Sequence, residues 1–189
     1  MIVLLAAVSA LGPVGMQILL PALPVIKETF AVSNDVAQLT LSLSMLAIAV
    51  GTLFYGPLSD KYGRKPIMLI GIVITLLGSL ICYVADSIFL LILGRFIQAF
   101  GGAVGLVLAR AIVRDVYGPE EAARVIATLV MVMVVLPMMS PALGGELMQR
   151  FGFESVFIVI AFASAIAFVF LFFWLPETLA KPCLLYAAV

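Results

Sequence analysis

Arg95 makes the strongest chemical demand on its surroundings, because it lies about eight residues inside a long apolar stretch. A guanidinium at that depth, about 12 Å below the membrane surface, costs at least about 2.5–3.5 kcal/mol. It should therefore face a cavity or a polar partner. Gln98 shares its helix face at i+3, and Gln17 lies at nearly the same depth in another apolar stretch. Gln17, Arg95 and Gln98 are therefore our candidates for the lining of a substrate cavity. In the alternative interpretations, Arg95 snorkels to the headgroups and Gln17 only joins two helices.

A second group of charged residues follows another apolar stretch, and Asp115 follows the stretch that contains Arg95. The group consists of Asp60, Lys61, Arg64 and Lys65. One interpretation is that these basic residues only set the orientation of the chain in the membrane. The other is that Asp60, Arg64 and Asp115 form an ion-pair cluster that joins three helix ends. Such a cluster can break in another conformation, which is how a gate works.

Pro137 and Pro141 interrupt a further apolar stretch and are followed by Gly144 and Gly145. Proline removes a backbone hydrogen bond and kinks a helix, while paired glycines allow a neighbouring helix to approach. This pattern predicts a hinge, although simple structural bending has the same sequence signature.

Several kinds of chemistry are excluded by composition. The chain has 189 residues and no His, which removes His-based triads, His general bases and most zinc sites. Cys82 and Cys183 have no metal-binding spacing, and no paired carboxylates lie within an apolar stretch. We therefore expect no metal site, no bound cofactor, no nucleic-acid partner and no enzymatic activity.

The elements that position these residues are six apolar stretches, each long enough to cross a bilayer. The chain is 65% hydrophobic and 11% charged, far from the roughly 25% charge of soluble domains. The stretches are Met1–Ile26, Val36–Leu58, Pro66–Ala85, Ile88–Val113, Ala122–Leu147 and Val156–Leu175. Their lengths exceed the roughly 9–11 residues of barrel strands. The prediction is an all-α polytopic membrane protein: one six-transmembrane-helix bundle over residues 1–179, with 180–189 as a tail or a truncated end.

Basic residues predict the orientation of this bundle. The connections after the second and fourth stretches share one side with both termini, and that side holds seven Lys and Arg against two on the other. The positive-inside rule therefore places both termini in the cytoplasm of a cell (inner or plasma) membrane, with the lipid bilayer as partner.

An internal repeat relates the two halves of the bundle. Shifting residues 56–65 by 89 positions superposes Gly56 on Gly145, Lys61 on Arg150 and Gly63 on Gly152. The same offset relates residues 1–85 to residues 88–175. When a unit with an odd number of spans is repeated, the second copy has the opposite orientation in the membrane. Inverted three-helix repeats of this kind are typical of transporters. Coincidence between two tight turns is the alternative.

Several motifs together resemble the major facilitator superfamily. Residues 56–65 match its loop signature G-x-x-x-D-[RK]-x-G-R-[RK], through Gly56, Asp60, Lys61, Gly63, Arg64 and Lys65. Residues 95–102 are similar to its helix-four motif, and residues 140–145 to the helix-five motif of proton antiporters, with Ser140 in place of the usual glycine. Residues 20–24 and 175–179 point more narrowly to twelve-helix drug:proton antiporters of the bicyclomycin/chloramphenicol-resistance type.

This resemblance implies alternating access, with one six-helix bundle rocking against another around a central cavity. It implies that Asp60, Arg64 and Asp115 form a cytoplasmic interlock and that Arg95 acts in coupling. The implied reaction is efflux of a small hydrophobic drug, driven by a proton gradient. A metabolite or sugar porter of the same superfamily, and a non-transporting membrane fragment or assembly factor, are the alternatives.

Two features depart from that family pattern. Relatives of this subgroup commonly carry an acidic residue where Gln17 stands, and an amide cannot exchange a proton. Superfamily transporters have twelve helices, and this sequence contains six predicted spans. Transport would therefore require a second six-helix half, from a C-terminal partner or a second copy.

Overall fold

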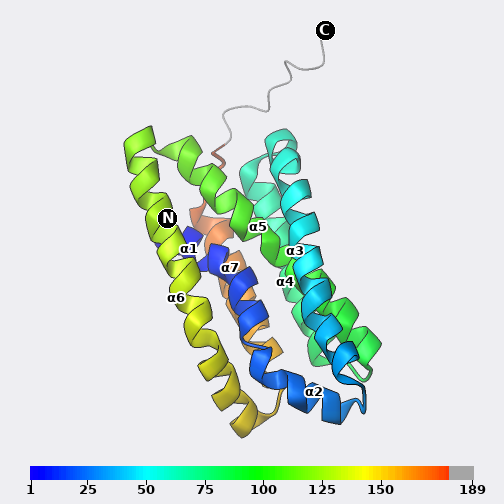
Figure 1. The fold of residues 1–189 in the computed structure, drawn as a ribbon. Coiled ribbons are helices and arrows are strands. Elements are labelled where there is room, and N and C mark those ends of the chain that lie inside the picture. The colour runs from blue at the N-terminus through cyan, green and yellow to red at the C-terminus, as the bar shows by residue number, and fades with distance from the viewer. Residues whose placement is uncertain (179–189) are drawn as a thin grey trace.

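The computed structural model describes residues 1–178, and these form a bundle of helices (Figure 1). The elements are α1 (Ile2–Gln17), the 3₁₀ turn η1 (Leu20–Ala22), α2 (Leu23–Thr29), α3 (Asn34–Tyr62), α4 (Arg64–Tyr83), α5 (Ile88–Val116), α6 (Pro119–Phe151) and α7 (Ser155–Trp174). Since α1, η1 and α2 together form one crossing, the described residues contain six helices long and apolar enough to span a membrane. The predicted all-α, six-span fold is confirmed.

The first predicted span is divided in the structure. Helix α1 ends at Gln17, and the chain forms the 3₁₀ turn η1 before α2 begins. Pro21 and Pro24 lie at the starts of η1 and α2, where a missing backbone N–H is tolerated. Other helix starts use side-chain caps, since the Ser33 and Ser87 hydroxyls accept hydrogen bonds from the amides of Val36 and Leu90.

Helix α5 is the centre of the packing and contacts α4, α3 and α1. In Figure 1, α6, α1 and α3 lie toward the viewer, α4 and α7 lie behind, and α5 runs obliquely among them. Small residues permit the close approach. At Gly101, an added Cβ would lie 2.5 Å from the Thr75 backbone nitrogen of α4, so any larger residue would push the two helices apart.

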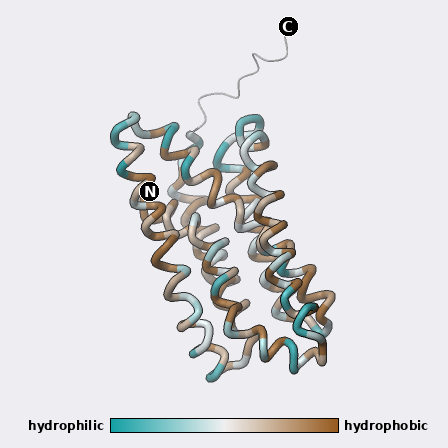
Figure 2. The backbone as a smooth tube through the Cα atoms, in the orientation of Figure 1, coloured by the Kyte–Doolittle hydropathy of each residue, from teal (hydrophilic) through white to brown (hydrophobic). Residues whose placement is uncertain are grey.

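Hydrophobic residues predominate along the helices, and hydrophilic residues are most frequent at the two ends of the bundle (Figure 2). Large side chains such as Phe54, Met138 and Phe173 are 61%, 76% and 73% exposed. Exposure of this extent is expected where lipid or another membrane segment covers the surface. The end that holds the α3–α4 and α5–α6 connections, uppermost in Figure 1, is called the basic end below.

The predicted repeat appears in the backbone geometry. Helices α3 and α6 both end at a glycine with positive φ, Gly63 at 103° and Gly152 at 84°. Each glycine amide donates at 3.0 Å to the carbonyl four residues earlier, on Ser59 and Met148 respectively. These partners are again 89 positions apart. Because consecutive spans alternate in direction, the two three-helix units are inverted relative to each other.

Candidate functional site

An ion-pair cluster at the basic end joins three helices through Arg64, the first residue of α4. Its Nη1 lies 2.5 Å from Asp60 Oδ1 of α3, and its Nε lies 3.0 Å from Asp115 Oδ2 of α5. Nη1 also donates to Ser59 Oγ at 2.6 Å. The Arg64 side chain is 12% exposed, while those of Asp60 and Asp115 are 63% and 27% exposed. The predicted cluster of Asp60, Arg64 and Asp115 is confirmed as a set of contacts.

The start of α4 is held by Glu177, which follows α7. The Arg64 amide donates to Glu177 Oε1 at 2.9 Å, and the Lys65 amide donates to Oε2 at 3.2 Å. A carboxylate at this position satisfies two of the unpaired N–H groups of a helix N-terminus and complements the positive end of the helix dipole. Glu177 therefore connects the segment after α7 to the helix that begins with Arg64, the central residue of the ion-pair cluster.

The remaining residues of the 56–65 motif take structural positions around this cluster. Lys65 Nζ donates to the Phe172 carbonyl of α7 at 2.9 Å, and Lys61 Nζ lies 5.1 Å from the centre of the Tyr62 ring. The Gly56 carbonyl accepts a hydrogen bond from the Ser59 hydroxyl at 2.8 Å. Gly63 supplies the positive φ that allows α3 to end and α4 to begin at once.

Arg95 is enclosed by three helices and is 1% exposed. Its Nη1 donates to the Gly15 carbonyl of α1 at 2.9 Å and to the Gln98 side-chain oxygen, while Gln98 Nε2 donates to Ser79 Oγ of α4 at 2.7 Å. The alternative in which Arg95 snorkels to the headgroups is wrong, because the guanidinium is turned into the bundle. The prediction that Arg95 and Gln98 share a helix face is confirmed. The hydrogen-bond acceptors of Arg95 are the Gln98 side-chain oxygen and a backbone carbonyl of α1.

A small space adjoins this network. It has a volume of about 10 Å³ and is lined by Leu11, Gly12, Gly15, Met16, Thr75, Arg95, Gln98 and Ala99. Arg95 Nε is buried and has no hydrogen-bond partner among the described residues. A space of this volume is at the lower limit for one water molecule, which an N–H group can bind.

Gln17 lies apart from Arg95, on another side of α1. Gly15, whose carbonyl accepts from Arg95, precedes Gln17 by two residues, and two residues turn a helix by about 200°. Gln17 lines a groove of about 380 Å³ between α1 and α6, with Pro13, Met133, Val134, Pro137, Met138 and Pro141. The predicted cavity residues therefore separate into an enclosed Arg95–Gln98 pair and a Gln17 that faces the groove.

The prolines of the predicted hinge lie beside Gln17 in this groove. Helix α6 nevertheless continues through both of them from Pro119 to Phe151. Pro141 cannot donate to the Pro137 carbonyl, and the Ser140 hydroxyl donates to that carbonyl instead, at 2.8 Å. The hydroxyl therefore replaces the backbone bond that Pro141 removes.

The two hinge glycines occupy different surroundings. An added Cβ at Gly144 would lie 2.9 Å from Ile18 Cγ1, whereas one at Gly145 would meet nothing within 4 Å. Gly144 thus sets how closely α6 approaches the end of α1, and Gly145 adjoins open space.

Sequence reasoning assigned no role to Glu177, Ser59 or Ser79. Glu177 belongs to the 175–179 motif, which can be recognised in the sequence. The contact of its carboxylate with the start of α4 cannot. Ser59 lies within the 56–65 signature at a position where that signature allows any residue, and Ser79 carries no sequence signal. Among the residues that the structure describes, no group of three His, Cys, Asp or Glu side chains could hold a metal ion.

Two inverted three-helix units, with an ion-pair cluster at one end and an enclosed arginine, define a six-helix bundle of the kind from which secondary transporters are built. The Major Facilitator Superfamily model matches residues 5–184, and the chain belongs to that family. Members of this family are transporters and not enzymes.

Relatives and solved structures agree with this assignment. The chain is 33% identical over 180 residues to a bicyclomycin resistance protein homolog of Haemophilus influenzae, covering 95% of this chain and 45% of the relative. It is 31% identical over 178 residues to multidrug resistance protein D of Escherichia coli, covering 94% and 44%. The chain spans about half the length of the curated relatives it matches.

The similar solved structures share the fold at lower identity. A bacterial homolog of the human lysosomal transporter Spinster, inward-facing and unoccupied, has a TM-score of 0.81 at 20% identity, covering 94% of this chain and 43% of that one. The human organic anion transporter MFSD10 has a TM-score of 0.76 at 21% identity, covering 94% and 47%.

Proposed function

We propose that this chain forms the N-terminal half of a proton-coupled exporter of small hydrophobic compounds, working by alternating access. The observation that carries the proposal is the Arg64 cluster, which holds the ends of α3, α4 and α5 together at the basic end. Contacts of this kind exist in one arrangement of the helices and break in another. They can therefore stabilise the state in which the transport path is closed at the basic end.

The direction and the substrate class are supported by the relatives. Their names include a bicyclomycin resistance protein homolog and multidrug resistance proteins, and a transporter confers resistance when it removes the toxic compound from the cell. The groove beside Gln17 supports the same class, because thioether and proline side chains surround a single amide there.

The bundle alone offers one wall of a transport path, so the proposal includes a second six-helix half, either a C-terminal partner or a second copy. Gln17 cannot exchange a proton. The proton would then be carried by a carboxylate of that second half. The basic end would face the cytoplasm of the cell membrane, as the positive-inside rule predicts.

The test is retention of fluorescent compounds by cells that produce the chain, either alone or together with a C-terminal six-helix half taken from a relative. Ethidium, an amphiphilic cation, and an anilinonaphthalene sulfonate, an amphiphilic anion, serve as probes beside a radiolabelled sugar. We expect lower retention of at least one dye, and we expect a protonophore to abolish the difference. Cells producing the Asp115→Asn variant should retain more dye than those producing the unaltered chain.

The same measurement separates the alternatives. Accumulation of the sugar without any change in dye retention would favour a porter of metabolites or sugars. If the purified chain, reconstituted in liposomes together with a C-terminal six-helix half taken from a relative, moved none of the three probes and left a proton gradient intact, it would instead be a non-transporting membrane component.

A further inference from the structure

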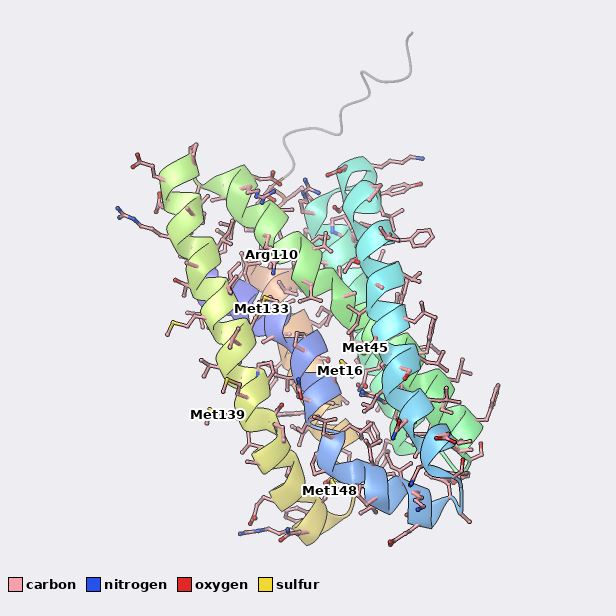
Figure 3. The ribbon with its side chains drawn as sticks, in the orientation of Figure 1. Met16, Met45, Arg110, Met133, Met139 and Met148 are labelled. Atoms are coloured by element: carbon pink, nitrogen blue, oxygen red, sulfur yellow. The ribbon has the colours of Figure 1, made fainter. Side chains whose placement is uncertain are left out.

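A second arginine of α5, Arg110, has an environment opposite to that of Arg95. Arg95 is enclosed and bonded, whereas the side chain of Arg110 is exposed on the face of the bundle toward the viewer in Figure 3. Arg110 lies six residues before Val116, the last residue of α5, which places its Cα about 9 Å inside the basic end. An exposed charge at this depth requires an explanation beyond orientation of the chain.

The Arg110 side chain does not extend to the nearer membrane surface. Its Nη2 lies 4.0 Å from Met133 Sδ of α6, and Figure 3 shows the two side chains adjacent. Met133 lies fourteen residues after Pro119, hence about 21 Å along α6 from the basic end. A snorkelling arginine would point the other way, toward the headgroups. The guanidinium is therefore directed toward the middle of the membrane.

No carboxylate compensates this charge within the part of the chain that the structure describes. The ion pairs there are made by Arg64 and Arg150. Helix α1 contains no Asp or Glu, and those of α5 and α6 lie in the first or last two turns. A charge inside a membrane protein faces water, a partner or a ligand, because lipid would leave it unsolvated.

Met133 also connects Arg110 to the groove between α1 and α6. It lines the same 380 Å³ depression as Gln17 and Met138. The exposed face therefore presents a cation, then a thioether surface, then a side-chain amide. A ligand that satisfies all three carries an anionic group, an apolar body and an acceptor or donor for the amide.

We propose that Arg110, Met133 and Gln17 form a binding surface for amphiphilic organic anions, in which the guanidinium pairs with a carboxylate, sulfonate or phosphate group and the apolar body lies on α6. This inference rests on the proposed transport function and narrows its substrate class. A positive wall without a carboxylate attracts anions and repels lipophilic cations.

The test measures binding of an anilinonaphthalene sulfonate and of ethidium to the purified chain in phosphatidylcholine nanodiscs, with empty nanodiscs as blank. We expect the sulfonate to bind more tightly than ethidium. Arg110→Gln should weaken sulfonate binding about tenfold or more, the effect of losing one charge-assisted hydrogen bond, and Arg110→Lys should restore part of it. Arg110→Glu should reverse the preference between the two dyes.

Arg124→Gln is the matched control, because Arg124 is also an exposed arginine but lies near the start of α6 at the basic end. It should leave both affinities unchanged. Equal sulfonate binding by the unaltered chain and by Arg110→Gln would overturn the inference, as would an equal loss in Arg124→Gln.

Anionic lipid is the other source of the same chemistry. If phosphatidylglycerol in the nanodiscs displaces the sulfonate, the surface holds a lipid headgroup and the substrate assignment is wrong. Undiminished binding in that lipid supports it. Export of ethidium but not of the sulfonate from cells would overturn this inference while leaving the transport proposal standing.

Discussion

Replacing Asp115 with asparagine tests whether the Arg64 cluster stabilises this arrangement of helix ends. The substitution retains the shape of the side chain but removes the charge that faces Arg64 Nε at 3.0 Å. Both partners are shielded, at 27% and 12% exposure, so the pair is a partly buried, charge-assisted contact. Such a contact contributes about 1.5–3 kcal/mol. We expect the free energy of unfolding of the bundle to fall by about that amount.

Two other carboxylates of the chain provide graded comparisons. Asp60 also pairs with Arg64 but is 63% exposed, so Asp60→Asn should cost only about 0.2–1 kcal/mol. Glu146 pairs with Arg150 at the same i,i+4 spacing, and both side chains are more than half exposed, at 57% and 69%. Glu146→Gln should therefore change stability by less than about 0.5 kcal/mol.

The assay is unfolding of the purified chain in mixed micelles by titration with a denaturing detergent, followed by circular dichroism. The three variants should rank with Asp115→Asn most destabilised, then Asp60→Asn, then Glu146→Gln. The reasoning from burial would be refuted if Asp60→Asn or the Glu146→Gln control cost as much as Asp115→Asn. A high-salt titration should reduce the Asp60 effect more than the Asp115 effect, because exposed pairs are screened more.

Three further variants test other contacts. Arg95→Met should keep the bundle folded, because removing a buried charge offsets the hydrogen bonds that are lost. The same variant should abolish dye export from cells. Loss of expression would instead show that Arg95 is purely structural. Glu177→Gln should lower the free energy of unfolding by about 0.3–1 kcal/mol, since the charge at the α4 N-terminus is lost while an acceptor remains. Ser140→Ala should cost about 1–3 kcal/mol in the same titration, because the Pro137 carbonyl loses its hydroxyl donor; an unchanged midpoint would show that water replaces it.

Contacts within one helix were predictable from sequence, because helical periodicity fixes them. Arg95 and Gln98, for example, share a face of α5 at i+3. The spans themselves followed from the length of the apolar stretches. These inferences need only the geometry of a single helix.

Contacts between helices were not predictable to the same extent, because they depend on how each helix is rotated about its axis. Depth along a helix can be counted from its ends, and on that basis Gln17 and Arg95 were placed at one level. Rotation is set by packing, and Gly15 rather than Gln17 faces Arg95. The acceptor is a backbone carbonyl, a group that every residue carries and that sequence therefore cannot single out.

The distribution of charge gives the last constraint on mechanism. Within the residues that the structure describes, the carboxylates lie in connections or near helix ends, while Arg95 and Arg110 lie along the length of α5. The interior and the groove face of this bundle are therefore positive. Coupling to protons requires a group that binds and releases one, and the Gln17 amide is not such a group. In the exporter that we propose, this group would be a carboxylate of the second six-helix half or the acidic group of the substrate itself. Arg95 and Arg110 would act on it as fixed positive charges.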